Sequence, residues 1–166
     1  MMADTARWTL PLLDAGQAQK EMTVNEALAR LDLLTQAGVV AVGTNVPPAT
    51  PGEGQAWIVG AAPTGIWAGH DRAVAGWTAG GWRFLDPREG MAAWSAADGC
   101  AATFVGGQWQ VGRVVGTSLV LGGAKVVGSR AAAIAAPVGG GVVDAEARGA
   151  LNAILAALRG HGLIAS

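Results

Sequence analysis

Apolar and polar residues follow three different patterns along the chain, and each pattern predicts a different kind of structure. Between residues 10 and 38 the apolar residues recur at helical spacing. Thr23 and Glu26 have the spacing of a capping box, which predicts a helix that begins there and stops at Gly38. Its apolar residues form one stripe, and the sequence leaves open whether this helix packs within its own subunit. The stripe consists of Val24, Ala27, Leu28, Leu31 and Leu34.

Short apolar runs separated by glycine form the second pattern, from residue 55 to residue 112. Residues 102–105 and 108–111 flank Gly106-Gly107, and a similar pair of runs lies within residues 73–85. Because glycine readily adopts the positive φ of tight hairpin turns, both pairs predict β-hairpins. We therefore expect a small antiparallel β module of about five to seven strands.

A proline- and glycine-rich segment, residues 45–54, precedes this module. Three prolines and two glycines within these ten residues cannot continue a helix or a central strand. We interpret the segment as a linker or as an ordered extended arm.

The third pattern begins at residue 113. Residues 119–121 and 125–127 predict one more hairpin, and Asp144 is placed as the N-cap of a final helix. This helix carries a seam with heptad spacing, formed by Ala147, Leu151, Ile154 and Leu158. The seam spans only about two heptads, fewer than a free-standing coiled coil needs. It can close on copies of itself or dock on the β module, and the pattern alone leaves both open.

These patterns predict the fold class α+β, mostly β, with an N-terminal helix, a small tryptophan-rich antiparallel β module and a C-terminal helix. The expected divisions are a helical segment, a Pro/Gly linker, the β module, and a hairpin followed by a helix. Their boundaries are 1–44, 45–54, 55–112 and 113–166.

Aromatic composition changes the interpretation of the β module. The chain has seven tryptophans, two phenylalanines and no tyrosine, against a background of 26 glycines and many alanines. Tryptophan rings either fill cores or bind ligands, so two interpretations stay open. In the first, rings that alternate inward form the core, namely Trp57, Trp82, Trp94 and Trp109. In the second, rings on a rim stack on sugars, and the candidates are Trp67, Trp77 and Trp82, with Trp67 expected to be the most exposed.

Charge and reactive residues exclude several function classes. A formal net charge of −1 provides no basic field for nucleic acid, so we expect no nucleic-acid partner. The chain has no apolar run long enough to span a membrane, and its N-terminus lacks the pattern of a secretory signal peptide. The single cysteine, Cys100, can form no disulfide within the chain.

Candidate catalytic groups are also weak. His70 and His161 have no partners at metal-ligand spacing, and no serine-hydrolase or phosphate-loop motif occurs. Four carboxylates in the β module are candidates for a glycosidase pair: Asp71, Asp86, Glu89 and Asp98. However, residues 86–90 are better explained as a turn with a local ion pair, and a domain this small has little with which to build a cleft. We therefore expect no enzyme activity and assign no catalytic residue, metal site or cofactor.

Several motifs resemble those of a family of unknown-function proteins encoded in alphaproteobacterial prophages and gene transfer agents, where relatives look like head-spike or tail-fibre components. The resemblance covers roughly residues 10 to 111, and the C-terminal end is similar to the ending of many such fibre proteins. The motifs that carry it are residues 10–21 and 25–32, Pro51-Gly52-Glu53-Gly54, Trp57-Ile58-Val59-Gly60, Trp67-Ala68-Gly69-His70, Gly81-Trp82-Arg83-Phe84 and Pro87-Arg88-Glu89-Gly90.

This resemblance implies a structural protein of a virion or phage-like particle, made in the bacterial cytoplasm, that helps the particle attach to host cell-surface polysaccharide. It further implies a homotrimer closed by the C-terminal seam and contacts with other virion proteins. In one version the segment up to Gly38 docks on the virion and another protein touches the host. A stand-alone carbohydrate-binding module is the alternative, and the oligomeric state discriminates the two.

Overall fold

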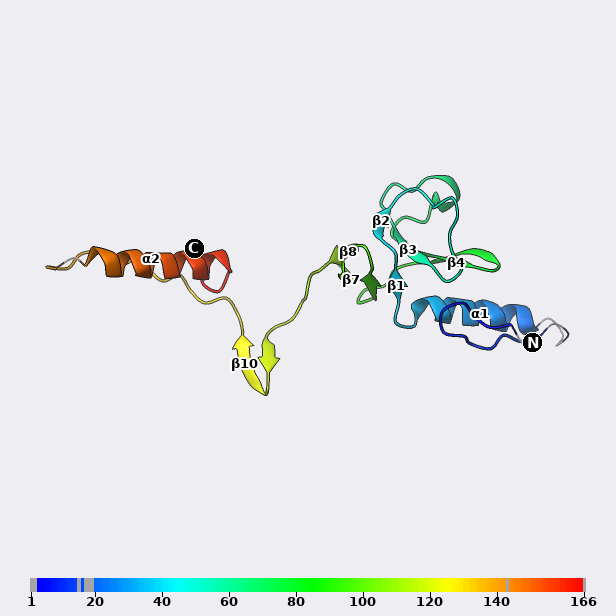
Figure 1. Cartoon of the computed structure of the whole chain (residues 1–166), viewed down its shortest axis with the longest axis horizontal. Coiled ribbons are helices and arrows are strands. Elements are labelled where there is room, and N and C mark those ends of the chain that lie inside the picture. The colour runs from blue at the N-terminus through cyan, green and yellow to red at the C-terminus, as the bar shows by residue number, and fades with distance from the viewer. Residues whose placement is uncertain (1–2, 15, 17–19, 143, 166) are drawn as a thin grey trace. The chain divides into compact units, whose positions relative to one another are not determined.

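The computed structural model describes residues 3–14, 16, 20–142 and 144–165. The chain forms two compact units, Met1–Arg113 and Val114–Ser166, which are described separately. Figure 1 shows the elements of both units in chain order. The described elements are two helices and mostly β-strands, which confirms the α+β class.

The first helix, α1 (Lys20–Leu34), differs at both ends from the prediction. Thr23 lies inside its first turn rather than capping it, so the expected capping box is wrong. The helix also ends before Gly38, because Gln36 adopts a left-handed conformation with φ of 43°. The Arg7 guanidinium donates hydrogen bonds to the carbonyl oxygens of Asp32, Leu33 and Gln36, which complements the negative end of the helix.

The orientation of α1, which the sequence leaves open, is not that of a helix that packs its apolar stripe on a core. Val24, Leu31 and Leu34 of the predicted stripe are exposed, whereas Asp32 is buried at 4% exposure beside the buried Leu33. The polar side of the helix thus faces the rest of the unit, and much of its apolar side faces solvent.

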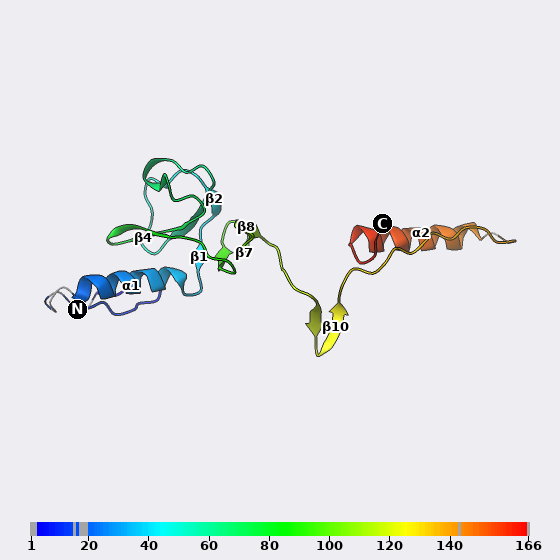
Figure 2. The same cartoon turned by 180° about the vertical axis from the view of Figure 1, so that it is seen from behind.

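An N-terminal arm, residues 3–14, explains this orientation, because it lies along α1 and hydrogen-bonds to its polar side (Figures 1 and 2). The Asp32 carboxylate accepts hydrogen bonds from the Thr5 hydroxyl at 2.7 Å and from the backbone N–H groups of Arg7 and Trp8 at 3.1 and 2.8 Å. Near the other end of the helix, the Asn25 amide accepts from the N–H of Leu13 and donates to its carbonyl oxygen. A buried carboxylate is tolerated only when it is satisfied in this way.

Two four-stranded sheets follow the helix. The first has the order β1-β6-β7-β8, with β1 (Gly38–Val39), β6 (Ala92–Ser95), β7 (Cys100–Val105) and β8 (Gln108–Val111). The second has the order β2-β3-β4-β5, with β2 (Val42–Thr44), β3 (Ala56–Val59), β4 (Val74–Thr78) and β5 (Gly81–Leu85). The sheets are mixed rather than purely antiparallel, because β1 pairs with β6 and β2 with β3 in parallel. A short 3₁₀ helix, η1 (Gly65–Trp67), lies between β3 and β4.

The predicted hairpins are confirmed. β7 and β8 are joined at Gly106-Gly107, whose φ angles of 62° and 74° suit a tight primed turn. β4 and β5 pair antiparallel, with Trp77 directly opposite Trp82. The proline-rich residues 45–54 are an ordered connection between β2 and β3 within the first unit.

Strand β3 lies at the centre of the first unit, because all four of its residues are buried. Ala56 and Ile58 belong to a core shared by both sheets and by Leu33 of α1, while Trp57 and Val59 belong to a second core that contains several tryptophans. Helix and sheet approach closely where Leu33 meets Gly76 of β4. A Cβ atom at Gly76 would lie only 2.4 Å from the Leu33 methyl carbons, so this contact requires glycine.

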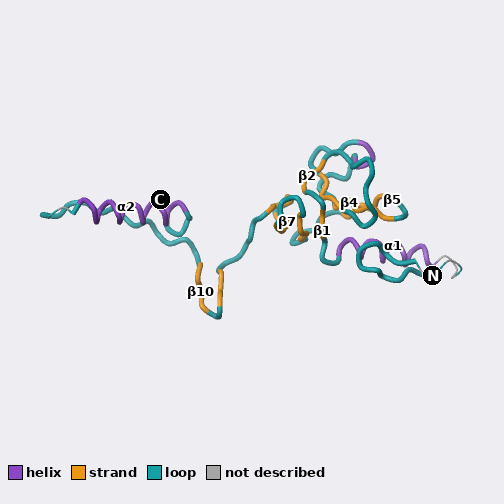
Figure 3. The backbone as a smooth tube through the Cα atoms, in the orientation of Figure 1, coloured by secondary structure: helices purple, strands orange, loops and turns teal. Residues whose placement is uncertain are grey.

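The second unit is sparse. It contains an isolated two-stranded hairpin, β9 (Leu119–Leu121) and β10 (Ala124–Val127), and the helix α2 (Ala145–Gly160) (Figure 3). The Asp144 carboxylate accepts a hydrogen bond from the N–H of Ala147, which confirms the predicted N-cap. Leu155 and Ile164 are buried, whereas all residues of both strands are exposed.

We predict that Asp32→Ala destabilises the first unit by about 2–4 kcal/mol, because it leaves a buried hydroxyl and two backbone N–H groups without their acceptor. Urea unfolding followed by tryptophan fluorescence measures the change. The exposed Asp86 gives a matched control, and Asp86→Ala is expected to stay within about 0.5 kcal/mol of the unsubstituted chain. Equal effects of the two substitutions would contradict the role given to Asp32.

Candidate functional site

Four tryptophans gather on the face of the second sheet that lies away from α1. The rings of Trp57, Trp67 and Trp82 have centroids 5.1 to 6.2 Å apart, in tilted and edge-to-face arrangements. Trp77 adds a fourth ring, 5.1 Å from Trp82 and at 66° to it. Such geometries are favourable for aromatic pairs, so the rings stabilise one another as well as filling volume.

Within this cluster, Trp67 is not the exposed ring that the sequence predicts. It is 0% exposed, because η1 turns its side chain into the second core between Trp57 and Trp82. A fully covered ring cannot stack on a sugar, so the expectation for Trp67 is wrong. Trp77 and Trp82 are half-buried and form the expected pair on one face of the hairpin. They are the ring candidates that the geometry leaves.

Trp94 departs from its prediction in the opposite direction. It was expected in the core together with Trp57 and Trp109, yet it is 56% exposed. The reason is the alternation along β6, where the small residues Ala93 and Ser95 point inward and Trp94 therefore points outward. Trp57 is buried as expected, and Trp109 packs against the main core and donates a hydrogen bond from its Nε1 to the Arg72 carbonyl oxygen.

A groove of about 660 Å³ opens on the α1 side of the same hairpin. Its walls come from the N-terminal arm, from α1, from the connection 45–54 and from the turn between β4 and β5. The surface of the groove is mostly apolar, and the polar side chains of Asp4, Asn25, Glu53 and Thr78 lie among apolar ones. The groove therefore combines apolar surface with a few hydrogen-bonding groups, rather than offering a flat aromatic platform.

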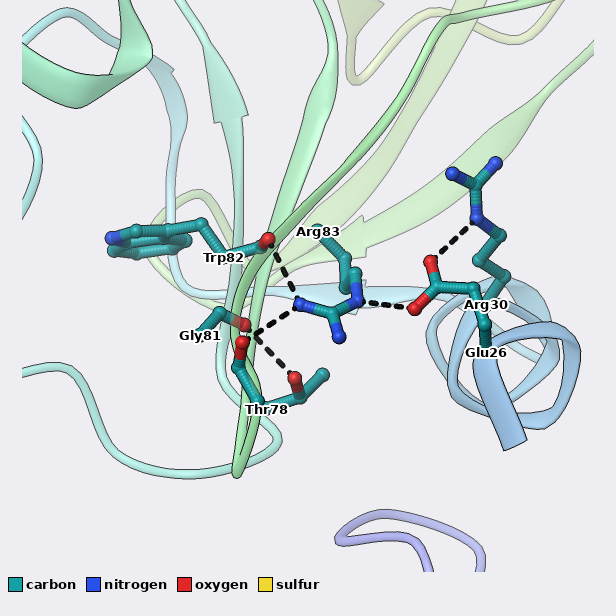
Figure 4. Close-up of polar contacts among 7 residues, drawn as sticks. Glu26, Arg30, Thr78, Gly81, Trp82 and Arg83 are labelled. Carbon is teal, nitrogen blue, oxygen red and sulfur yellow. Dashed lines mark hydrogen bonds and ion pairs between the residues drawn. The ribbon is translucent and has the colours of Figure 1, made fainter. Parts of the chain in front are cut away.

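Figure 4 shows the ion pair that bridges this groove. The Arg83 Nε donates to Glu26 Oε2 at 2.6 Å, and Arg30, one helical turn away, donates to Glu26 Oε1 at 3.0 Å. Arg83 also donates to the carbonyl oxygens of Gly80 and Trp82. The guanidinium therefore couples α1 to the β4–β5 hairpin and has its charge balanced by Glu26.

These contacts set the ionisation of Glu26. Partial burial raises the pKa of its carboxyl, but the hydrogen bonds and positive charges of Arg30 and Arg83 together outweigh burial. The pKa of Glu26 therefore lies below its ordinary value, and the carboxylate is ionised at neutral pH.

The seam of α2 is the second candidate surface, and it belongs to the second unit. Ala147 and Leu151 are exposed, Ile154 is 56% exposed, and Leu158 is half-buried. Leu155, which lies beside the seam, is the residue that α2 buries within its own unit. Heptad-spaced apolar side chains are thus presented outward, where a partner can cover them.

The four candidate glycosidase carboxylates are exposed, and three of them are engaged locally. Asp71 lies 3.8 Å from the guanidinium of Arg72, Glu89 accepts from the N–H of Gly106, and Asp98 accepts from Ser95. Within the described ranges, no three His, Cys, Asp or Glu side chains lie close enough to hold a metal ion. No helix in the described part of the chain is both long and apolar enough to cross a membrane.

The first unit is thus an α+β structure in which one helix and two mixed sheets share a core. Its family follows from comparison, since residues 24–110 match DUF2793, a family described as protein of unknown function. The match covers more than half of the chain, and the protein therefore belongs to this family. The chain has no match among curated proteins.

Sequence reasoning missed the bridge between Glu26 and Arg83 and the buried role of Asp32. Fifty-seven positions separate Glu26 from Arg83, so no local pattern links them. One signal was present: Asn25 and Asp32 lie seven residues apart and therefore on one side of the helix. That polar side could have been interpreted as the side that faces the arm.

We predict that Glu26→Gln lowers the stability of the first unit at pH 7 by at most about 1 kcal/mol, since solvent screens this partly exposed pair. Because the folded-state pKa of Glu26 is depressed, its contribution is complete above its unfolded pKa of about 4.3 and is lost as pH falls through the folded value. Urea midpoints of both chains should therefore draw together as the pH falls below about 4.3 and coincide once Glu26 is protonated in the folded chain. A gap that is unchanged between pH 7 and pH 3 would show that the ion pair is not its source.

Proposed function

We propose that this protein is a non-enzymatic structural component of a phage or gene-transfer-agent particle, either a head spike or a tail fibre. It assembles as a homotrimer, and it either attaches the particle to host cell-surface polysaccharide or anchors the protein that does so. The observation that carries the proposal is the state of the second unit, whose apolar residues are largely exposed in the single chain. The resemblance of both ends of the chain to particle proteins supports the same assignment.

A single copy of the second unit buries too few apolar side chains to fold stably. An isolated two-stranded hairpin is marginal in water, and a helix of this length needs its apolar face covered. Here every residue of both strands is exposed, and Leu151 and Ile154 of α2 face outward. Copies of the same helix, packed around a symmetry axis, cover Leu151 and Ile154 without any additional protein.

Polysaccharide contact is assigned to the half-buried pair Trp77 and Trp82, which lie at the rim of the tryptophan cluster. Their partial exposure leaves ring surface available for the apolar face of a sugar. The groove on the α1 side of the hairpin, which Trp77 also lines, supplies hydrogen-bonding groups such as Asn25 and Thr78 near the same turn. A stand-alone carbohydrate-binding module is the alternative function, and the same pair of rings is the observation that favours it.

For the assembly, we predict that the full chain in solution has about three times its 16.6 kDa monomer mass by light scattering. Replacing the seam by Leu151→Glu with Ile154→Glu should reduce the mass to that of a monomer, since charges are excluded from a closed apolar seam. Ala156→Glu is the matched control, because Ala156 is exposed on the opposite side of α2. An unsubstituted chain that is monomeric would refute the assembly.

For ligand contact, we predict that Trp77→Ala weakens binding to an array of bacterial surface polysaccharides by about tenfold or more. Trp94→Ala serves as the control, because Trp94 is exposed on the other sheet. Thermal unfolding of both variants verifies that the first unit remains folded. Loss of binding on Trp94→Ala alone would move the site to the other sheet, and an array without any bound glycan would leave the protein as an anchor within the particle.

A further inference from the structure

We infer that the exposed face of α1 is a second contact between copies of this chain, an inference that rests on the proposed homo-oligomer. The face consists of Val24, Ala27, Leu31 and Leu34, spaced three, four and three residues apart. All four are exposed, and Leu31 reaches 52%. This is the spacing of a coiled-coil seam, in which side chains of one helix fill gaps on another.

The outward orientation of this face is fixed by the opposite side of the helix. Asn25, Glu26 and Asp32 bind the arm and the β5 strand through hydrogen bonds, and the Asp32 carboxylate is buried. Turning α1 to hide its apolar residues would break these bonds and leave a buried charge unsatisfied, which is costly. The apolar face is therefore a stable feature of the folded unit.

The spacing of the face favours another helix of the same kind as its partner. Helices that meet along a seam of this spacing cross at a shallow angle, and the small Ala27 side chain allows their backbones to approach. Identical helices arranged around a symmetry axis present the same residue at the same level. Each apolar side chain on α1 therefore meets its own counterpart.

The size of the face indicates that the partner is another copy of this chain. A helix of 15 residues is roughly 22 Å long, so the contact is short and falls below the area of a stable stand-alone interface. The seam of α2 is equally short, and it is carried by the same chain. Two weak contacts on one chain reinforce each other only when the partner offers both, because the second then forms at high effective concentration. A second copy of the chain meets this condition.

Cysteine cross-linking tests the contact in the full-length chain. In a Cys100→Ser background, Ala27→Cys should give a disulfide-linked dimer on mild oxidation, since Ala27 meets Ala27 of the neighbouring copy. The control is Ala29→Cys, because Ala29 is half-buried and lines the groove on the opposite side of α1. The variant should remain uncross-linked.

A second variant measures the energetic contribution. Leu31→Glu should raise the dissociation constant of the assembly by at least about tenfold, with an unchanged far-ultraviolet circular dichroism spectrum, because Leu31 is exposed in the folded unit. An assembly that tolerates Leu31→Glu but dissociates on substitution of the α2 seam would overturn the α1 contact and leave the proposed function intact. Weakening by Leu31→Glu without any Ala27→Cys cross-link would also overturn it, since another element would then cover α1. A monomeric unsubstituted chain would overturn the proposed assembly itself.

Discussion

The buried carboxylate of Asp32 determines how α1 lies in the first unit. By accepting hydrogen bonds from Thr5, Arg7 and Trp8, it holds the N-terminal arm on the helix and turns the polar side inward. In this orientation Leu33, the next residue, packs on Gly76 of β4. Glu26, on the adjacent side of the helix, accepts a hydrogen bond from Arg83. The apolar residues of α1 are consequently presented to the outside. An apolar stripe that a helix would otherwise bury is thereby left exposed to solvent in the single chain.

Small residues impose a second constraint, because a chain rich in glycine and alanine has few side chains with which to fill a core. In the first unit the helix and the sheet approach closely at Gly76, which leaves less volume to fill. Tryptophan rings fill the second core, beside β3. This use of tryptophan removes Trp57 and Trp67 from ligand binding and leaves the pair Trp77 and Trp82 at the rim. The second unit has no comparable core, since Leu155 and Ile164 are the buried apolar residues in its described part.

Features governed by neighbouring residues were predictable from the sequence, and those governed by distant partners were not. The glycine turns of the hairpins and the Asp144 cap depend on local backbone geometry, and both were predicted correctly. The orientation of α1 depends on an arm more than twenty residues away, and helical spacing alone does not reveal that the polar side of the helix faces this arm. Likewise, the exposure of Trp94 and the burial of Trp67 depend on which side of each strand or turn meets the core. Trp77 and Trp82 remain candidates for sugar binding, and they were predictable as a pair because they lie directly opposite each other in one hairpin.

The buried residues of the first unit indicate that it folds within one chain, whereas we propose that the second unit completes its burial only between copies. Hydrogen exchange measured over a dilution series of the full chain tests this most directly, because protection reports local opening. We expect amides of β3 and β4 to stay protected at every concentration, and those of β10 and α2 to lose protection as the assembly dissociates. Equal protection of α2 in the dilute monomer and in the concentrated protein would show that the second unit folds without a second copy.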